Sequence, residues 1–267
     1  MTLPTLPESF GWTQSACGLV LKCRPLEAVA PHLFTTRQLS LSSQDDWSRI
    51  ALVLGVPHVV TLTQVHGRGV VVITRGSPRP VERSTGDVLV SNDPDTAVAV
   101  RAADCVPLLL ADPQSGAVAA VHAGWRGVAA GAVTAAVDAL AREFGARPEH
   151  VHAAIGPSIG VCCYEVGSEL VDAFAAAGHA QYLVDRWFVA PPAPRGRFEP
   201  VLNRVARSPL HLDVAGATRD QLVLAGVPET QIHVSGLCTA MHLDILTSYR
   251  AEKDRAGRIT GVIRPPQ

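Results

Sequence analysis

The sequence is poor in charge and has no long apolar run. Charged residues make up 18% of the 267 residues, and the formal net charge is −1. This balance argues against nucleic acid as an obligatory partner, because phosphate binding requires a basic excess. Apolar stretches such as 128–137 fall short of the roughly 20 residues that a membrane span needs. Met1 is not followed by a basic residue and then an apolar run, which is the pattern of a secretory signal. We therefore expect no secretory signal and a cytoplasmic location.

Cysteine is also scarce, with six residues in the whole chain, which is too few for a disulfide scaffold. Each cysteine is therefore expected to fill the core, bind a metal or act as a nucleophile. Hydrophobic residues, in contrast, make up 47% of the chain. This content excludes disorder as the main state and allows a substantial core.

The order of apolar segments and turn signals predicts one domain of the α/β or mixed α+β class. Residues 1–35 are expected to be loop-like apart from a short strand at 18–23. Residues 112–116 favour a hairpin turn, and the Pro-rich stretch 190–197 is predicted to be an inserted loop. Helices are predicted at 43–54, 127–144, 167–177 and 213–225, and strands at 59–65, 69–73, 87–90, 97–100, 107–111, 117–121, 151–155, 231–234 and 258–263.

Three segments place a histidine or a cysteine at the end of a predicted strand. The residues are His66, Cys105 and His122, each in a segment with small residues that let side chains converge. Two imidazoles and one thiolate suit zinc, and three protein ligands leave a fourth position for water or substrate. Their spacing matches no zinc-finger pattern. Separate roles therefore remain open, as a turn histidine, a core cysteine and a strand-end histidine.

The stretch 124–127 (Gly-Trp-Arg-Gly) precedes the predicted long helix. Free N–H groups at a helix start suit an anion, and Arg126 would add a charged donor. The alternative is that the glycines only permit a tight turn and close packing. The stretch is neither a dinucleotide fingerprint nor a P-loop.

Two further groups are weaker candidates. The turn at 156–160 and the following Cys162-Cys163-Tyr164-Glu165 are more typical of a structural turn than of a pocket wall. His150 and His152 point to one face of a predicted strand, where copper binding competes with plain surface exposure.

Taken together, these motifs resemble the laccase-domain family, historically named multicopper polyphenol oxidases and now associated with bacterial purine nucleoside phosphorylase activity. The resemblance runs from about residue 34 to 263. It is carried by 34–37 (Phe-Thr-Thr-Arg), 64–67 (Gln-Val-His-Gly), 86–90 (Gly-Asp-Val-Leu-Val), 103–107 (Ala-Asp-Cys-Val-Pro), 122–127 (His-Ala-Gly-Trp-Arg-Gly), 155–160 (Ile-Gly-Pro-Ser-Ile-Gly), 163–167 (Cys-Tyr-Glu-Val-Gly), 238–239 (Cys-Thr) and 248–250 (Ser-Tyr-Arg).

The resemblance implies a single compact domain, residues 1–267, with mixed β-sheets flanked by helices. It implies a metal site at His66, Cys105 and His122, occupied by zinc or by copper. The implied activities are phosphorolysis of adenosine, inosine, guanosine and methylthioadenosine, together with adenosine deamination. Purine nucleosides and phosphate are thus the expected partners of a monomer or small homo-oligomer.

The remaining site roles are hypotheses. We assign acid or base chemistry to Asp104 and Asp87, because the usual deaminase signature is absent. Arg126 would stabilise charge in the reaction, and substrate contacts are expected from Arg37, Gln64 and Gly124. The family's Gly-Gly-Val-Ser stretch is missing after Arg37, which affects the expected substrate loop. Ser158 stands where the family often has cysteine or another small residue, a change without expected effect.

Three alternatives stay open. Copper-dependent polyphenol oxidation needs a histidine-rich trinuclear cluster, and only His150 and His152 form a His-x-His pair. A cysteine hydrolase would use Cys105 as nucleophile and His122 as base. A non-enzymatic binding or assembly factor for cell-envelope or redox proteins would bind the metal without turning over nucleosides.

Overall fold

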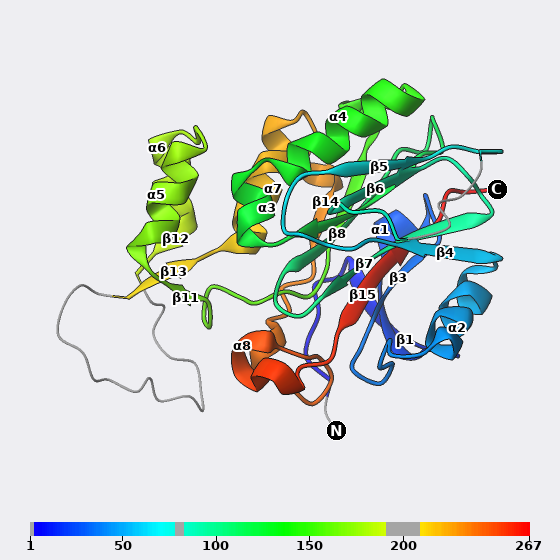
Figure 1. The fold of residues 1–267 in the computed structure, drawn as a ribbon, viewed down its shortest axis with the longest axis horizontal. Helices are drawn as coiled ribbons and strands as arrows, with labels where there is room; N and C mark the ends of the chain where they lie inside the picture. The colour runs from blue at the N-terminus through cyan, green and yellow to red at the C-terminus, as the bar shows by residue number, and fades with distance from the viewer. Residues whose placement is uncertain (1–2, 78–82, 191–208) are drawn as a thin grey trace.

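Two six-stranded sheets lie face to face, and helices cover the outer face of each (Figure 1). The computed structural model describes residues 3–77, 83–190 and 209–267. The first sheet has the order β1 (Phe10–Ser15), β2 (Gly18–Cys23), β3 (His32–Thr35), β15 (Ile259–Ile263), β7 (Thr96–Ala102) and β4 (His58–Thr61). The second sheet has the order β14 (Ile232–Val234), β10 (His152–Ile155), β8 (Val106–Ala111), β9 (Val118–Ala123), β6 (Val88–Ser91) and β5 (Val70–Ile73).

Each sheet contains both parallel and antiparallel pairs, as the mixed fold class requires. The β4–β7, β5–β6 and β10–β14 pairs are parallel, whereas the hairpin partners β8 and β9 are antiparallel. The predicted fold class and the predicted hairpin are therefore confirmed. The hairpin register pairs Val106 with Ala123 and Pro107 with His122, which brings the start of β8 beside the end of β9.

Strand β8 is apolar along its whole length because both of its faces are buried. In β8, Leu109 packs between the two sheets, while Leu108 and Leu110 pack against the helices on the outer face. Strands with this environment have a continuous apolar sequence instead of an alternating one. The continuous run at 107–111 is thus the sequence signature of a middle layer.

The helices form the two outer layers of the sandwich. The helices α3 (Trp125–Ala129), α4 (Ala132–Phe144) and α7 (Val214–Leu224) pack on the second sheet, and α2 (Gln44–Leu54) packs on the first. Helix α2 begins with a capping box between Ser43 and Asp46 and ends at Gly55, which has a left-handed backbone. Within the described residues, none of the helices combines the length and apolar character that a bilayer crossing requires.

The predicted long helix over 127–144 is wrong, because two helices replace it. Helix α3 ends at Ala129, and α4 begins after Gly131, whose φ is +83°. A left-handed residue cannot continue an α-helix, so the chain changes direction there. The prediction of a largely loop-like start is also wrong: residues 10–35 contain three strands and the short helix α1 (Arg24–Glu27).

A third, small sheet extends to one side of the sandwich (Figure 1). It contains β11 (Glu165–Val166), β13 (Leu210–Leu212) and β12 (Phe188–Val189), next to the helices α5 (Ser168–Ala176) and α6 (Gln181–Trp187). The predicted helix at 167–177 corresponds to α5. The predicted loop at 190–197 lies, except for residue 190, outside the described residues. The remaining short helices are α8 (Tyr249–Glu252) and the 3-10 turns Pro148–His150, Glu229–Gln231, Thr239–Met241 and Lys253–Arg255.

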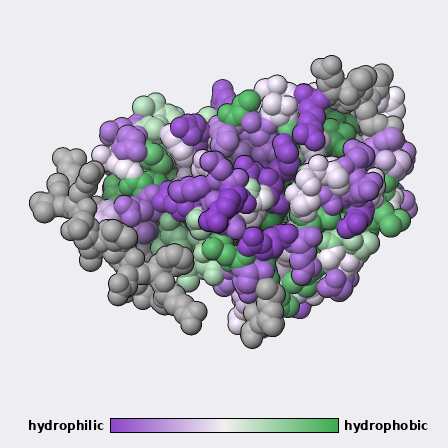
Figure 2. Space-filling model, turned by 60° about the horizontal axis from the view of Figure 1, so that its bottom comes forward, coloured by the Kyte–Doolittle hydropathy of each residue, from purple (hydrophilic) through white to green (hydrophobic). Residues whose placement is uncertain are grey.

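On the face shown in Figure 2, hydrophilic residues predominate and hydrophobic residues occur in small separate groups. The large hydrophobic side chains that are exposed lie on different elements, among them Leu52, Val65, Tyr182, Leu224 and Tyr249. Scattered exposure of this kind is usual for a folded protein.

Candidate metal centre

The structure brings together the three side chains that the sequence suggested as ligands. His66, Cys105 and His122 each offer one ligand atom, and these atoms all lie within 4.8 Å of one another. His122 belongs to β9, Cys105 directly precedes β8, and His66 lies in the connection from β4 to β5. The β8–β9 register places Cys105 beside His122, whereas His66 arrives from a connection between the two sheets.

A buried carboxylate behind the ligands fixes two of them. The carboxylate of Asp87 accepts the backbone N–H groups of Val65, His66 and Gly67 at 3.3, 2.9 and 2.6 Å. The same carboxylate lies 2.8 Å from Nδ1 of His122. An ionised carboxylate only accepts hydrogen bonds, so Nδ1 carries a proton and Nε2 is the potential ligand atom. Such a carboxylate–histidine pair is typical of metal ligands.

The ionisation of the site favours a thiolate at neutral pH. Burial opposes ionisation of Cys105, but hydrogen bonds and positive charge from His122 and His66 outweigh it and lower the pKa of the thiol to about 6. Burial also opposes protonation of His122, yet hydrogen bonds to Asp87 and Cys105 raise its pKa to about 9. The pKa of Asp87 is lowered because hydrogen bonds from His122 and Gly67 overcome its burial. A thiolate is the form that binds a metal and also the form that attacks an electrophile.

Gly124 makes room for the ligands. A Cβ atom at this position would lie 2.7 Å from Sγ of Cys105 and 3.2 Å from Cδ2 of His66. The φ of Gly124 is −77°, so space and not backbone freedom requires the glycine. The lack of a side chain at Gly124 therefore admits the ligand side chains.

The backbone is strained at two positions of the site. His66 has a φ of +60° and Asp104, next to Cys105, has a φ of +87°. Left-handed backbone in residues other than glycine is uncommon and occurs often at functional sites. The carboxylate of Asp104 accepts hydrogen bonds from Oγ1 of Thr239 and from the N–H of Arg250, both at 2.6 Å. Asp104 thus joins the ligand turn to the chain around 239–250.

Two other predicted site residues, Gln64 and Arg37, have partners elsewhere in the protein. Gln64 donates to the carbonyl oxygen of Arg101 at 2.7 Å and accepts its N–H at 2.9 Å, so both ends of this amide bind backbone. Arg37 forms an ion pair with Glu252 at 3.0 Å and donates to two carbonyl oxygens, those of Leu243 and Leu246. These contacts stabilise the loops that surround the centre.

Arg126 is exposed and stacks on Trp125, with its Cζ 4.3 Å from the ring centroid. It lies in α3, which has five residues, and not at the start of a long helix. The helix that begins after Gly124 is therefore shorter than the one expected from the sequence. The positive charge of Arg126 acts on Tyr164, whose pKa the charge of Cys105 also affects.

Two residues near the centre had no predicted role. Burial and the negative charge of Cys105 raise the pKa of Tyr164 to about 12, while Arg250 and Arg126 act in the opposite direction. Cζ of Arg250 lies 5.3 Å from the ring centroid of Tyr164. The only sequence signal for these two residues was their presence in motifs 163–167 and 248–250. Tyr164 and the two arginines share the neighbourhood of Cys105.

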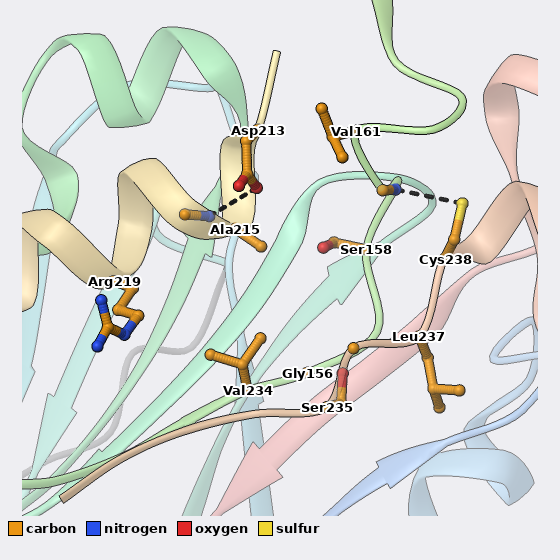
Figure 3. Close-up of a pocket in the computed structure, with 13 residues that line it drawn as sticks. Gly156, Ser158, Val161, Asp213, Ala215, Arg219, Val234, Ser235, Leu237 and Cys238 are labelled. Carbon is orange, nitrogen blue, oxygen red and sulfur yellow. Dashed lines mark hydrogen bonds between the residues drawn. The ribbon is translucent and has the colours of Figure 1, made fainter. Parts of the chain in front are cut away.

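A separate cavity of about 310 Å³ lies behind the turn 156–160 (Figure 3). Figure 3 shows Asp213 and Arg219, from the start of α7 and its first turns, across from Ser158 and Cys238. Asp213 accepts the N–H of Gly216 at 2.8 Å and so caps α7. No metal-centre ligand lines this cavity, but its wall is connected to the centre, because the N–H of Ile159 donates to the carbonyl oxygen of Asp104 at 2.9 Å.

Comparison with known proteins gives a consistent result. The sequence pattern of the family described as multi-copper polyphenol oxidoreductase laccase matches residues 40–265. The chain is 36% identical, over 273 residues, to a Deinococcus radiodurans protein named purine nucleoside phosphorylase, covering 95% of this chain and 96% of that protein. It is 34% identical over 179 residues to adenosine deaminase RL5 of an unknown prokaryotic organism. That match covers 67% of this chain and 62% of the relative. The crystal structure of Bacillus licheniformis hypothetical protein YfiH is similar, with a TM-score of 0.79 and 26% sequence identity. The superposition covers 95% of this chain and 97% of that chain.

Proposed function

The chain belongs to the multi-copper polyphenol oxidoreductase laccase family, and from this premise we propose that it is a zinc-dependent purine nucleoside phosphorylase. The observation that carries the proposal is the His66–Cys105–His122 set with Asp87 bonded to His122. Three protein ligands with a carboxylate behind one histidine fit a catalytic zinc ion. The names of the relatives support the substrate class, purine nucleosides and phosphate.

The donor set favours zinc over multicopper chemistry. A multicopper oxidase needs a histidine-rich cluster of three copper ions besides its thiolate site. Among residues 3–77, 83–190 and 209–267, only one other group of potential ligands lies close enough together, and it consists of three cysteines. A single copper ion could still occupy the centre, and elemental analysis of the purified protein would reveal it.

In the proposed reaction, a phosphate oxygen attacks C1′ of the ribose, the bond from C1′ to the purine nitrogen breaks, and the purine takes up a proton. His66, Cys105 and His122 would hold a zinc ion, which would supply a Lewis acid when bound. Arg126 and Arg250 supply positive charge for phosphate, and Tyr164 keeps its proton on Oη, where it can donate to the departing purine. The products are the free base and ribose 1-phosphate.

The remaining predicted residues are assigned to positioning. Asp87 holds His66 and His122, and Asp104 holds the turn before Cys105. Gln64 and Arg37 bind backbone groups of neighbouring segments. We therefore transfer the acid role from Asp87 and Asp104 to Tyr164, since both carboxylates already accept several hydrogen bonds.

The test is direct. Purified protein is incubated with phosphate and each of adenosine, inosine, guanosine and methylthioadenosine, and the products are separated by chromatography. We expect free base and ribose 1-phosphate (or its methylthio analogue), and inosine from adenosine if deamination also occurs. Activity should disappear in Cys105→Ala and remain in Cys17→Ala, which removes a buried thiol outside the centre. Absence of every product from zinc-loaded wild-type protein would contradict the proposal.

One observation favours a second candidate, a cysteine hydrolase with Cys105 as nucleophile. The low pKa of this thiol, beside a protonated His122, is typical of an activated cysteine. Metal removal separates the two functions. Chelation should abolish phosphorolysis, and added zinc should restore it, whereas a cysteine nucleophile would work best without metal. If the chelated protein hydrolyses its substrate and loses that activity on alkylation of Cys105, the second candidate is correct.

A further inference from the structure

A second group of three cysteines lies apart from the metal centre. Cys162, Cys163 and Cys238 bring their sulfur atoms to within 4.8 Å of one another. The sulfurs of Cys162 and Cys163 are 3.5 Å apart, and all three cysteines are free thiols. None of the three takes part in the proposed phosphorolysis.

Backbone contacts hold this cluster together. The segments around Ser158 and Cys238 form a parallel β-bridge, and the N–H of Thr239 donates to the carbonyl oxygen of Ser158 at 2.9 Å. The N–H of Gly160 donates to Sγ of Cys238 at 3.2 Å. A Cβ on Gly160 would lie 3.1 Å from Cβ of Cys238, so the glycine permits the close approach. The two segments thus meet in a fixed arrangement before any ion is bound.

The cluster is reachable from solvent. Cys162 is exposed, Cys163 is half-buried, and Cys238 is buried but lines the cavity behind the turn 156–160 (Figure 3). The cluster therefore has one sulfur-bearing residue at the surface and another in the wall of the cavity. An ion can reach them without unfolding of the sandwich.

We propose that Cys162, Cys163 and Cys238 form a binding site for a single Cu(I) ion. Thiolate sulfur is a soft donor and selects soft cations such as Cu(I). Structural zinc sites need four ligands, and within the described part of the chain no histidine or carboxylate joins this group. Three sulfurs without a fourth donor match Cu(I) better than Zn²⁺. No oxidation or reduction step is involved.

Binding of an ion by these thiols should depend on pH. Burial and neighbouring sulfurs raise the pKa of Cys162 and of Cys163. Without a cation these two thiols therefore stay protonated at neutral pH and are poor nucleophiles. Binding of the ion must release their protons, so the affinity for Cu(I) should increase with pH.

An ion at this position would also hold together two segments that contact the metal centre. The segments that carry the cysteines contain Ile159 and Thr239, and both donate hydrogen bonds to Asp104. Asp104 precedes Cys105 in the chain. Occupation of the three-sulfur site would thus stabilise the turn that presents the thiolate ligand of the metal centre.

The test must separate the two sites, so it uses the full-length Cys105→Ala protein, which lacks the thiolate of the metal centre. Cu(I) is titrated anaerobically against a coloured Cu(I) chelator such as bicinchoninate, and copper X-ray absorption counts the sulfur neighbours. We expect one equivalent of Cu(I) with three sulfur neighbours. Further replacement of Cys162, Cys163 and Cys238 by Ser should remove that equivalent. A matched variant with Cys17→Ser should retain it.

Two safeguards make the result decisive. Because Cys162 is exposed, Cys162→Ser alone should keep the fold, checked by circular dichroism, and should still weaken Cu(I) binding. The proposal is overturned if Cys105→Ala protein takes up no Cu(I), if nitrogen neighbours replace sulfur in the absorption spectrum, or if Zn²⁺ displaces Cu(I) from the three cysteines. Phosphorolysis is not a readout, so failure here leaves the proposed enzymatic function intact.

Discussion

At the residue scale, the metal centre depends on Asp87, which is completely buried and bonds to two of the ligand-bearing residues. Its carboxylate orients His122 through Nδ1 and fixes the strained backbone of His66. Replacement of such an outer carboxylate typically lowers metal affinity by roughly 10- to 100-fold. The effect is indirect, since it acts through ligand orientation.

Asp87→Asn should therefore weaken zinc binding by about 10- to 100-fold. The amide keeps one oxygen acceptor but turns an NH2 group toward hydrogen-bond donors. Competition with a zinc chelator measures the affinity. The matched control is Asp112→Asn, because Asp112 is also a buried carboxylate that accepts backbone N–H groups, at the far end of the β8–β9 hairpin. Equal affinities for both variants would refute the orienting role.

Gly124→Ala tests the space between the ligands. The added methyl group would lie 2.7 Å from the sulfur of Cys105, so the sulfur must move and zinc affinity should fall at least about tenfold. Gly257→Ala is the control, because its nearest neighbour would be at an ordinary 3.8 Å. Zinc content and circular dichroism distinguish a damaged centre from a damaged fold. Unchanged zinc affinity in the folded Gly124→Ala protein would show that the centre tolerates the methyl group.

The ligand triad could be proposed from the sequence, because histidine and cysteine at strand ends show their chemistry directly. The roles of their neighbours could not. Asp87 is separated from His122 by 35 positions, and only the β6–β9 pairing brings them together. Tyr164 and Arg250 come from segments farther apart still, and their side chains meet only in the folded chain.

At the element scale, α2 lies on the outer face of the first sheet, and its own packing cluster does not include the metal centre. Its capping box can therefore be changed without touching the site. Ser43→Ala should lower the free energy of unfolding by about 1 kcal/mol and leave phosphorolysis unchanged. Urea denaturation measures the free energy of unfolding. The control is Ser48→Ala, because the hydroxyl of Ser48 bonds only to the carbonyl oxygen of Gln44 in the same helix. If this control lowered the free energy of unfolding as much as Ser43→Ala does, a specific role of the cap would be disproved.

The elements that the sequence predicted correctly are those with strong local signals. The helix at 43–54 has a cap at each end, and the hairpin at 107–121 has a clear turn. The third sheet could not be predicted, because β11 and β12 have two residues each and exist only through pairing with β13. The break in the helix at 127–144 was missed because Gly131 lies among good helix formers, and glycine inside a helix does not by itself end it.

At the scale of the whole molecule, the stability of the sandwich should depend on pH through His32 in β3. Burial lowers the pKa of His32 to about 4, from 6.5 in an exposed residue. Its Nε2 accepts the N–H of Cys23, and its Nδ1 lies 3.0 Å from the carbonyl oxygen of Ala30, so the neutral form fits the core. Between pH 6.5 and 4 the unfolded chain binds more protons at this residue than the folded chain does.

The contribution of His32 to the free energy of unfolding is therefore complete above pH 6.5 and is lost as the pH falls toward 4. Over this range the free energy of unfolding should fall with a slope approaching about 1.4 kcal/mol per pH unit. Urea denaturation at several pH values measures it. His32→Gln keeps an acceptor and a donor but does not titrate, so its stability should fall less steeply over this range. Parallel curves for the two proteins would mean that other groups cause the acid sensitivity.

The positions of the ligands in the sandwich have one mechanical consequence. His66 lies on the passage from the first sheet to the second, Cys105 lies on another such passage, and His122 lies within the second sheet. Any sliding of one sheet over the other must alter the coordination geometry. The absorption spectrum of cobalt substituted at this centre would thus report the alignment of the two sheets.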